Sequence, residues 1–197
     1  MKFDEGYIKF NLNWEEKAFE LDGDVFLLLS SYRNKLYQLG LIGVYDNGIG
    51  FGNLSVRHNQ KEFIISGSAT GNIPEPEQKH YALVKDFDIQ NNKVWCQGST
   101  KASSESMSHA AIYESNNNVN AVIHIHHNKV WEKLLDVLPT TDKKAEFGTP
   151  EMAFEIASLS KTDSGIIIMG GHPEGIISYG KNMEDAYQLL LKQYNEL

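Results

Sequence analysis

The chain has a single cysteine, Cys96, among its 197 residues. One cysteine cannot form an internal disulfide, and the sequence has no CxxC pair for a zinc finger or a dithiol redox centre. Cys96 ends the strand-like run from Lys93, where a small buried side chain is the simplest interpretation. Because disulfides are rare in reducing compartments, this composition favours a cytoplasmic protein.

Basic charge and long apolar runs are also scarce. The chain has 18 Lys and Arg against 26 Asp and Glu, a formal net charge of -8. Nucleic acids and anionic membranes attract basic surfaces, so we expect neither as a partner. The most apolar stretches, Val25 to Leu29 and Ile166 to Met169, are too short to span a bilayer. A small anionic ligand stays compatible, because backbone amides can bind an anion locally.

The sequence contains no repeat, low-complexity tract or Pro/Gly-rich linker, and we therefore predict one domain over residues 1–197. Apolar spacing and capping signals predict four helices, and alternating or apolar runs predict the strands. Two of the expected helices span residues 24–39 and 183–194. Ser103 or Ser104 caps a third, which runs through Tyr113, and a fourth has Thr149 as N-cap and Pro150 in its first turn. The expected strands are 53–57, 61–66, 81–87, 94–96, 119–126, 166–169 and 175–179. Without strict βαβ alternation, the short turns favour an α/β fold with antiparallel pairing.

Three histidines form the most informative pattern of the chain. Alternation along a strand places His124 and His126 on one face and His127 on the other. His172 follows another predicted strand at a Gly-Gly bend, and could complete a half-open site for a divalent metal. The alternative is three unrelated polar side chains, which spacing alone does not exclude. The remaining histidines have no partner at matching spacing and are expected on the surface or on helices: His58, His80 and His109.

Small polar residues cluster in three further segments. Ser103-Ser104-Glu105 is either a helix cap with the acid in the first turn, or an anion-binding turn next to an acid/base. The general frequency of such caps favours the first interpretation. The segments 52–55 and 67–71 would each usually be only a turn. Together with the serines they offer amides, hydroxyls and one carboxamide to a phosphate, but the lysine of a P-loop is absent.

The order of these motifs resembles that of the class II aldolase/adducin family. The matching segments, over about residues 25–192, are Gly-Asn-Leu-Ser, Thr-Gly, Ser-Ser-Glu, His-x-His, Phe-Gly-Thr-Pro-Glu and a late Gly-His. The resemblance implies a three-layer α/β/α sandwich around a mostly antiparallel central sheet. It also implies a cytoplasmic enzyme of carbohydrate metabolism that assembles as a homo-oligomer, commonly a tetramer with its sites at subunit interfaces.

The resemblance further implies a metal-dependent lyase, an aldolase that cleaves a ketose phosphate or similar small carbonyl sugar through a metal-stabilised enediolate. Zn²⁺ or another divalent ion would be held by His124, His126 and His172, and Glu105 would be the catalytic acid/base. The substrate phosphate would be bound by Asn53, Thr70, Gly71, Ser103 and Ser104. A tyrosine from a neighbouring subunit assists in such aldolases, with Tyr179, Tyr187 and Tyr194 as candidates here.

Two departures and three alternatives accompany this resemblance. Pro173, which Glu174 follows, stands directly after the third histidine where the aldolases usually have glycine, and Ala69 replaces the proline of the phosphate loop. A sugar-phosphate dehydratase of the methylthioribulose-phosphate type would use the same apparatus. So would a pentulose-phosphate 4-epimerase, although epimerases usually carry Asp at the position of Glu105. A non-catalytic, adducin-like interaction domain would lack the metal histidines, all of which are present.

Overall fold

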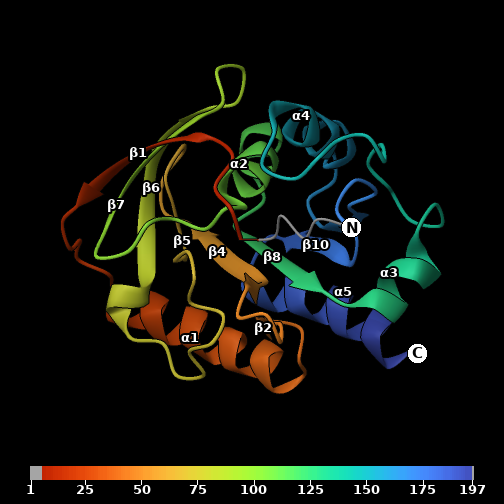
Figure 1. Ribbon diagram of the computed structural model, residues 1–197, viewed down its shortest axis with the longest axis horizontal. Helices are drawn as coiled ribbons and strands as arrows, with labels where there is room; N and C mark the ends of the chain where they lie inside the picture. The colour runs from red at the N-terminus through yellow and green to blue at the C-terminus, as the bar shows by residue number, and fades with distance from the viewer. Residues whose placement is uncertain (1–5, 197) are drawn as a thin grey trace.

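The computed structural model describes residues 6–196, and a large sheet runs through it (Figure 1). In hydrogen-bonded order, its eight strands are β1 (Asn11–Glu16), β7 (Lys93–Gly98), β6 (Tyr81–Asp88), β5 (Phe63–Ser66), β4 (Asn53–Arg57), β8 (Ala121–His126), β10 (Gly175–Gly180) and β9 (Gly165–Ile168). Only the edge pair β1–β7 is parallel among the strand pairs of residues 6–196. The prediction of an α/β fold with a mostly antiparallel sheet is confirmed.

Helices lie on opposite sides of this sheet in Figure 1, with α1 and α5 together on one side and α2 and α4 on the other. The described helices are α1 (Gly23–Gln38), α2 (Ser106–Ser115), α3 (Asn128–Leu134), α4 (Pro150–Leu159), α5 (Met183–Asn195) and the short 3-10 helix η1 (Gln78–His80). A separate hairpin of β2 (Gly43–Val44) and β3 (Gly50–Phe51) stands near the end of β8. None of the described helices has the length and apolarity needed to cross a membrane.

Alternation along β8 divides the buried side chains into two cores. Val122 packs in one core with Met107 of α2, whereas Ile123 and Ile125 pack in the other with Leu29 of α1. His124 and His126 have the same parity as Val122, so they face the side of the sheet that carries α2. The sheet therefore directs two imidazoles into the buried layer between β8 and α2.

Capping residues fix where several helices begin. Asp22 accepts hydrogen bonds from Asp24 N and Val25 N at the start of α1. Thr149 accepts from Met152 N with Pro150 as the first helical residue of α4, as predicted. The predicted strand 53–57 matches β4 exactly in its bounds, and the other predicted elements differ from the observed ones by a few residues at their ends.

The Ser-Ser-Glu segment differs from its expected capping role. Helix α2 begins at Ser106, and the preceding Glu105 makes no side-chain capping hydrogen bond. Ser103 Oγ accepts from Glu105 N at 3.3 Å, and Ser106 Oγ donates to Ser103 O at 2.7 Å. These local bonds stabilise the turn before the helix. The prediction that Ser103 or Ser104 caps this helix, with Glu105 in its first turn, is therefore wrong.

Candidate metal and anion site

The three predicted histidines converge in the structure. Strand β8 carries His124 and His126, and His172 lies in the turn between β9 and β10. The three residues offer ligand nitrogens that all lie within 4.8 Å of one another. The three side chains are buried, with 0%, 4% and 3% of their surface exposed for His124, His126 and His172. The interpretation as three unrelated histidines is therefore wrong.

Close backbone packing brings His172 to the pair on β8. Gly175 is in register with His126 in the β10–β8 ladder. A Cβ atom on Gly175 would lie 2.4 Å from His172 Cδ2, so only glycine leaves room for the ring. Gly175 N donates to His172 O at 2.9 Å and thereby closes the turn that holds the third imidazole.

The electrostatics of the three rings suit a cation. Burial lowers the pKa of His124 to about 4, and burial together with neighbouring imidazoles lowers the pKa of His126 and of His172 well below the ordinary value. The rings are consequently neutral near pH 7, which is the form that coordinates a metal. Three neutral nitrogens with room for further ligands are the donor set of catalytic zinc and related divalent sites. The residues present therefore fit a divalent ion.

Glu105 lies beside this cluster at the start of α2. Its carboxyl group is 1% exposed, and Oε1 lies 4.0 Å from His172 Nε2. Oε2 accepts a hydrogen bond from Ser108 Oγ at 2.7 Å, whereas Oε1 has no hydrogen-bond partner among the described residues. Burial raises the pKa of Glu105 to about 7, against smaller opposing effects of Ser108 and Lys9. A carboxyl group with this pKa can both donate and accept a proton near neutrality.

A small hollow next to the histidines brings together all five residues expected to bind phosphate. The residues that line it are Gly6, Gly50, Phe51, Gly52, Asn53, Gly67, Ser68, Ala69, Thr70, Gly71, Ser103 and Ser104. Asn53 Oδ1 is buried without a hydrogen-bond partner among residues 6–196. Asn53 on β4 is in register with His124 on β8, so the hollow and the histidine cluster adjoin across one strand pair. Backbone amides, hydroxyls and a carboxamide in this setting suit an anionic group.

Arg33 supports the hollow from behind, although no motif in the sequence pointed to it. Its buried guanidinium donates to the carbonyl oxygens of Thr70 and Ile73, and so holds the loop from α1. The available signal was an arginine at the buried spacing of α1, between Leu29 and Leu36. The guanidinium of Arg33 contacts carbonyl oxygens behind the loop and does not line the hollow. No lysine or arginine side chain is among the described residues that line it.

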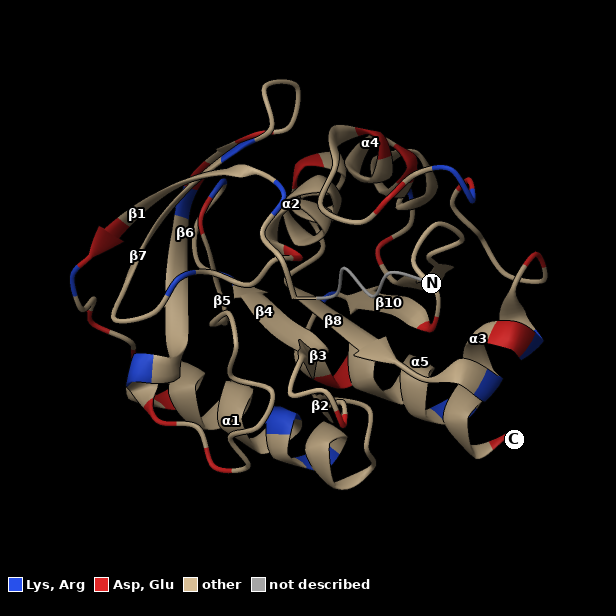
Figure 2. Ribbon diagram, viewed as in Figure 1, with Lys and Arg blue, Asp and Glu red and all other residues tan. Residues whose placement is uncertain are grey.

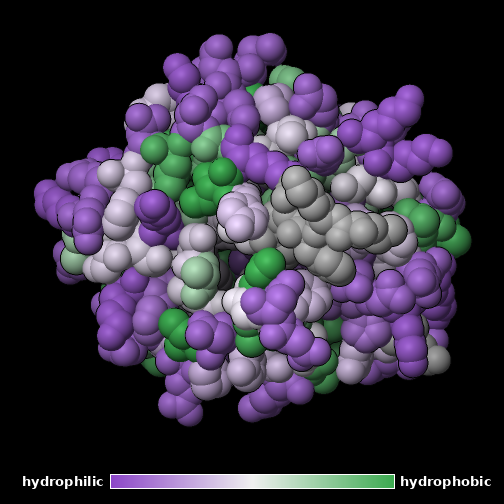
Figure 3. All heavy atoms as spheres, viewed as in Figure 1, coloured by the Kyte–Doolittle hydropathy of each residue, from purple (hydrophilic) through white to green (hydrophobic). Residues whose placement is uncertain are grey.

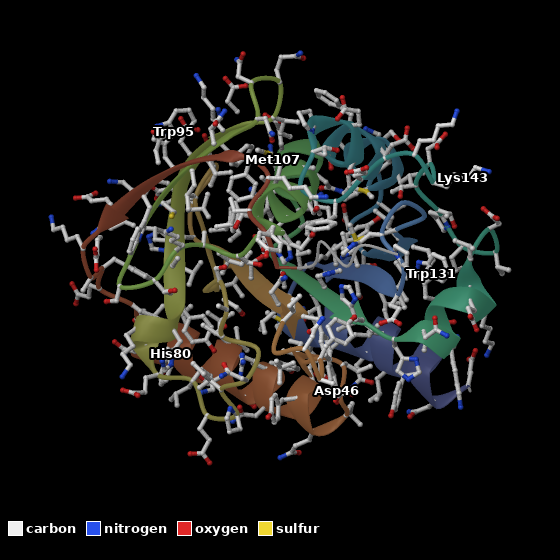
Figure 4. All side chains as sticks on the ribbon, viewed as in Figure 1. Asp46, His80, Trp95, Met107, Trp131 and Lys143 are labelled. Carbon is white, nitrogen blue, oxygen red and sulfur yellow. The ribbon has the colours of Figure 1, made fainter. Side chains whose placement is uncertain are left out.

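The other histidines lie apart from the cluster or make separate contacts. His127 faces away as predicted: its ring accepts from Val130 N and caps α3. His80 lies beside α1 and away from β8 in Figure 4, and accepts from Glu77 N. His58 is exposed, as expected. His109 lies on α2 but is completely buried, where its Nδ1 is 2.7 Å from Ser55 Oγ.

Charged side chains are arranged around this site rather than within its central strand. Strand β8 contains no Lys, Arg, Asp or Glu and is tan throughout in Figure 2. The face in Figure 3 carries small green areas separated by purple, so apolar side chains do not gather there in one continuous surface. The candidate site therefore consists of buried polar side chains and is not marked by a charged or apolar surface patch.

Comparison with known proteins agrees with this geometry. Residues 44–131 match the family model described as the class II aldolase and adducin N-terminal domain, a span that includes Glu105, His124 and His126. A curated relative from Methanocaldococcus jannaschii, named L-fuculose phosphate aldolase, is 29% identical over 154 residues, which cover 69% of this chain and 76% of that protein.

Solved structures share the fold at lower identity. An L-fuculose 1-phosphate aldolase superposes with a TM-score of 0.68 at 22% identity, covering 89% of this chain and 84% of that one. YgbL of Escherichia coli, described as an aldolase, epimerase or decarboxylase, gives a TM-score of 0.62 at 15% identity, with coverages of 83% of this chain and 82% of that one. At these identities the likeness establishes the architecture alone.

Proposed function

We propose that the chain, whose residues 44–131 match the model of the class II aldolase and adducin family, is a metal-dependent lyase of the aldolase type. Its substrate would be a ketose phosphate or a similar small carbonyl sugar. One observation carries this proposal. Three neutral imidazoles and the carboxyl group of Glu105, 4.0 Å from His172, are buried together beside a hollow lined by amides and hydroxyls. The names of the relatives, which include fuculose phosphate aldolases, support the same reaction class.

His124, His126 and His172 would hold the divalent ion, for which we propose zinc. When bound, such an ion supplies the positive charge that stabilises an enediolate. The chain's own contribution is a rigid frame, since two of the three imidazoles stand on one central strand. Such rigidity stabilises developing charge without reorganisation during the reaction.

The phosphate would bind in the hollow formed by Asn53, Thr70, Gly71, Ser103 and Ser104. The Thr70 hydroxyl donates to Gly67 O at 2.8 Å, which keeps the loop closed around its backbone amides. Neutral donors hold a phosphate while Arg33 adds a positive charge from behind the loop. Anchoring the phosphate in this way positions the carbonyl end of the sugar beside the histidines.

Glu105 would move the proton. Its pKa of about 7 lets the carboxylate take a proton from a substrate hydroxyl and return it to carbon after the carbon–carbon bond breaks. Ser108 Oγ holds the other carboxylate oxygen, which leaves Oε1 directed to the space next to His172. Burial of the carboxyl group excludes water from this exchange.

One experiment separates the possible reactions. Purified protein is analysed for bound metal and then incubated with a panel of ketose phosphates, with and without chelator. Metal-dependent release of an aldehyde supports the proposal. Loss of water would identify a dehydratase of the methylthioribulose-phosphate type, and inversion at carbon 4 would identify an epimerase. Absence of both metal and turnover would indicate an adducin-like interaction domain.

We further propose a single class II aldolase-like domain over residues 1–197, built as a three-layer α/β/α sandwich. We expect a cytoplasmic homotetramer with a sugar phosphate as its ligand, and no nucleic-acid or membrane partner. Of the three candidate tyrosines, Tyr179 and Tyr187 are buried, with 2% and 8% of their surface exposed, so the partly buried Tyr194 is better placed to reach a neighbouring subunit. Light scattering coupled to size-exclusion chromatography measures the subunit number.

A further inference from the structure

Tyr45 joins His126 to the carboxylate of Glu174, which no motif in the sequence connects with the site. Its hydroxyl oxygen lies 2.9 Å from His126 Nδ1 and 2.8 Å from Glu174 Oε2. Tyr45 begins the turn of the β2–β3 hairpin, whereas Glu174 lies in the turn before β10. We infer that Glu174, acting through Tyr45, fixes the tautomer and the orientation of His126 so that Nε2 can bind a divalent cation. This inference rests on the metal site proposed above.

The donors and acceptors of this chain allow one arrangement. A carboxylate can only accept, so the Tyr45 hydroxyl donates its proton to Glu174. The same hydroxyl oxygen is then an acceptor toward His126, whose Nδ1 must carry the proton. A neutral imidazole has one N–H, and Nε2 of His126 is therefore left with its lone pair.

The backbone fixes the tautomer of the other histidine on β8, His124, in the same way. His124 Nδ1 lies 3.2 Å from Ile176 O, and a carbonyl only accepts, so His124 is also protonated on Nδ1. The Nε2 atoms of His124 and His126 are 3.0 Å apart. Two lone pairs at this separation repel each other unless a cation or a proton lies between them. The hydrogen bonds around both rings thus prepare a place for positive charge.

Without the Tyr45–Glu174 pair, a competing arrangement becomes available to His126. Its proton could move to Nε2 and be donated to Nε2 of His124 across the same 3.0 Å. Such a bond would satisfy both rings internally and occupy the nitrogens that a metal needs. Glu174 and Tyr45 are therefore positioning residues that disfavour this self-bonded state.

Backbone constraints hold both partners in place. Glu174 has a φ of 68°, a left-handed conformation that residues other than glycine seldom adopt, and its carbonyl accepts from His127 N at 3.0 Å. The Tyr45 ring packs against Phe51 with ring centroids 4.5 Å apart.

The test compares Tyr45→Phe, Glu174→Ala and Glu174→Gln with wild type. The matched control is Tyr32→Phe, which removes another tyrosine hydroxyl bonded to a glutamate, Glu184, between α1 and α5. Nitrogen NMR of ¹⁵N-histidine-labelled, metal-free protein reports the tautomer of His126, and competition with a chromogenic chelator measures Zn²⁺ affinity. Circular dichroism confirms that each variant is folded.

We expect Tyr45→Phe and Glu174→Ala to weaken Zn²⁺ binding by about 10- to 100-fold, as for other partners of metal-bound histidines. Both should shift His126 toward the Nε2–H tautomer. Glu174→Gln should lose less, because its amide oxygen still accepts the Tyr45 proton. Tyr32→Phe should match wild type in both measurements.

Wild-type affinity and an unchanged tautomer in folded Tyr45→Phe, or in Glu174→Gln and Glu174→Ala alike, would overturn the inference. The result is distinguishable from failure of the proposed lyase activity. A wild-type protein that binds Zn²⁺ with His126 protonated on Nδ1, but turns over no sugar phosphate, would remove the proposed function and leave the inference standing. A wild-type protein protonated on Nε2 would overturn the inference even if it were an active lyase.

Discussion

Glu105 Oε1 and His172 Nε2 lie 4.0 Å apart in a space that neither shares with bulk water. These two atoms come from the start of α2 and from the β9–β10 turn, on opposite sides of the histidine strand in the sequence. Their proximity places a titrating carboxyl group where a reacting carbon next to the cluster would need a proton.

Replacing Glu105 with glutamine should abolish proton transfer while the histidines keep their metal. Gln has nearly the same shape and can still accept from Ser108, so the fold should persist. We expect kcat to fall by about 10²- to 10⁴-fold, the usual contribution of a general acid/base. Steady-state kinetics and elemental analysis check both statements. An active, metal-loaded variant would assign the proton transfer to another group.

The same substitution should change the pH dependence of stability in metal-free protein. The pKa of Glu105 is about 7 in the folded chain against an ordinary value of 4.5, so the folded protein keeps a proton that the unfolded chain has lost. The stabilisation from this proton is complete below about pH 4.5 and is lost as pH rises to about 7. The effect is on the order of 3 kcal/mol, at roughly 1.4 kcal/mol per pKa unit.

Urea unfolding of wild type and Glu105→Gln at pH 5 and pH 7.5 measures this effect. The stability of wild type relative to the variant should fall as pH rises, since the histidine contributions are common to both proteins. A relative stability that stays constant over this range would mean that Glu105 titrates near its ordinary pKa despite its burial.

Neighbouring histidines offer a matched pair of substitutions at the end of β8. His126→Ala should remove bound metal and turnover together, because it deletes one of the convergent nitrogens. His127→Ala should retain the metal and lose about 1 kcal/mol of stability, because its ring caps α3 and packs against Tyr194, away from the cluster. Elemental analysis and thermal unfolding provide the measurements. Equal metal loss from the two variants would contradict the assignment of faces along β8.

A methyl group at Gly71 should damage the anion hollow. An added Cβ would lie 2.1 Å from Gly43 O and 2.8 Å from Gly50 Cα, so the loop and the β2–β3 hairpin would have to separate. We expect Gly71→Ala to raise KM for a phosphorylated substrate by at least about 10-fold, a change of about 1.4 kcal/mol. Gly23→Ala is the control, because no atom lies within 4 Å of its added Cβ. An unaltered KM in Gly71→Ala would exclude this loop from phosphate binding.

Local regularity explains what could be predicted from the sequence. The strand period of two placed His124 and His126 together and His127 apart, and the Thr149-Pro150 signal marked the start of α4. The Gly-Gly bend after a predicted strand indicated His172, the family resemblance added Glu105, and both lie next to the pair on β8 in the structure. None of these predictions required knowledge of which strands pair.

Contacts between distant segments explain what was missed. Strand β1 is an edge strand with mostly exposed, polar side chains, and only its parallel pairing with β7 identifies it. Tyr45 and Glu174 are 129 positions apart, and their contact depends on the registers of β8 with β10 and of β2 with β3. The capping prediction at Ser103 failed because its hydroxyl bonds within the preceding turn.

The pairing of Asn53 with His124 across β4 and β8 has a consequence for selectivity. Strands that are hydrogen-bonded neighbours lie about 4.8 Å apart, and this separation hardly varies. A ligand that touches both residues must match a length set by the main chain. We therefore expect discrimination among sugars of different size to persist when surrounding loops are altered, because the spacing between β4 and β8 sets the length that fits.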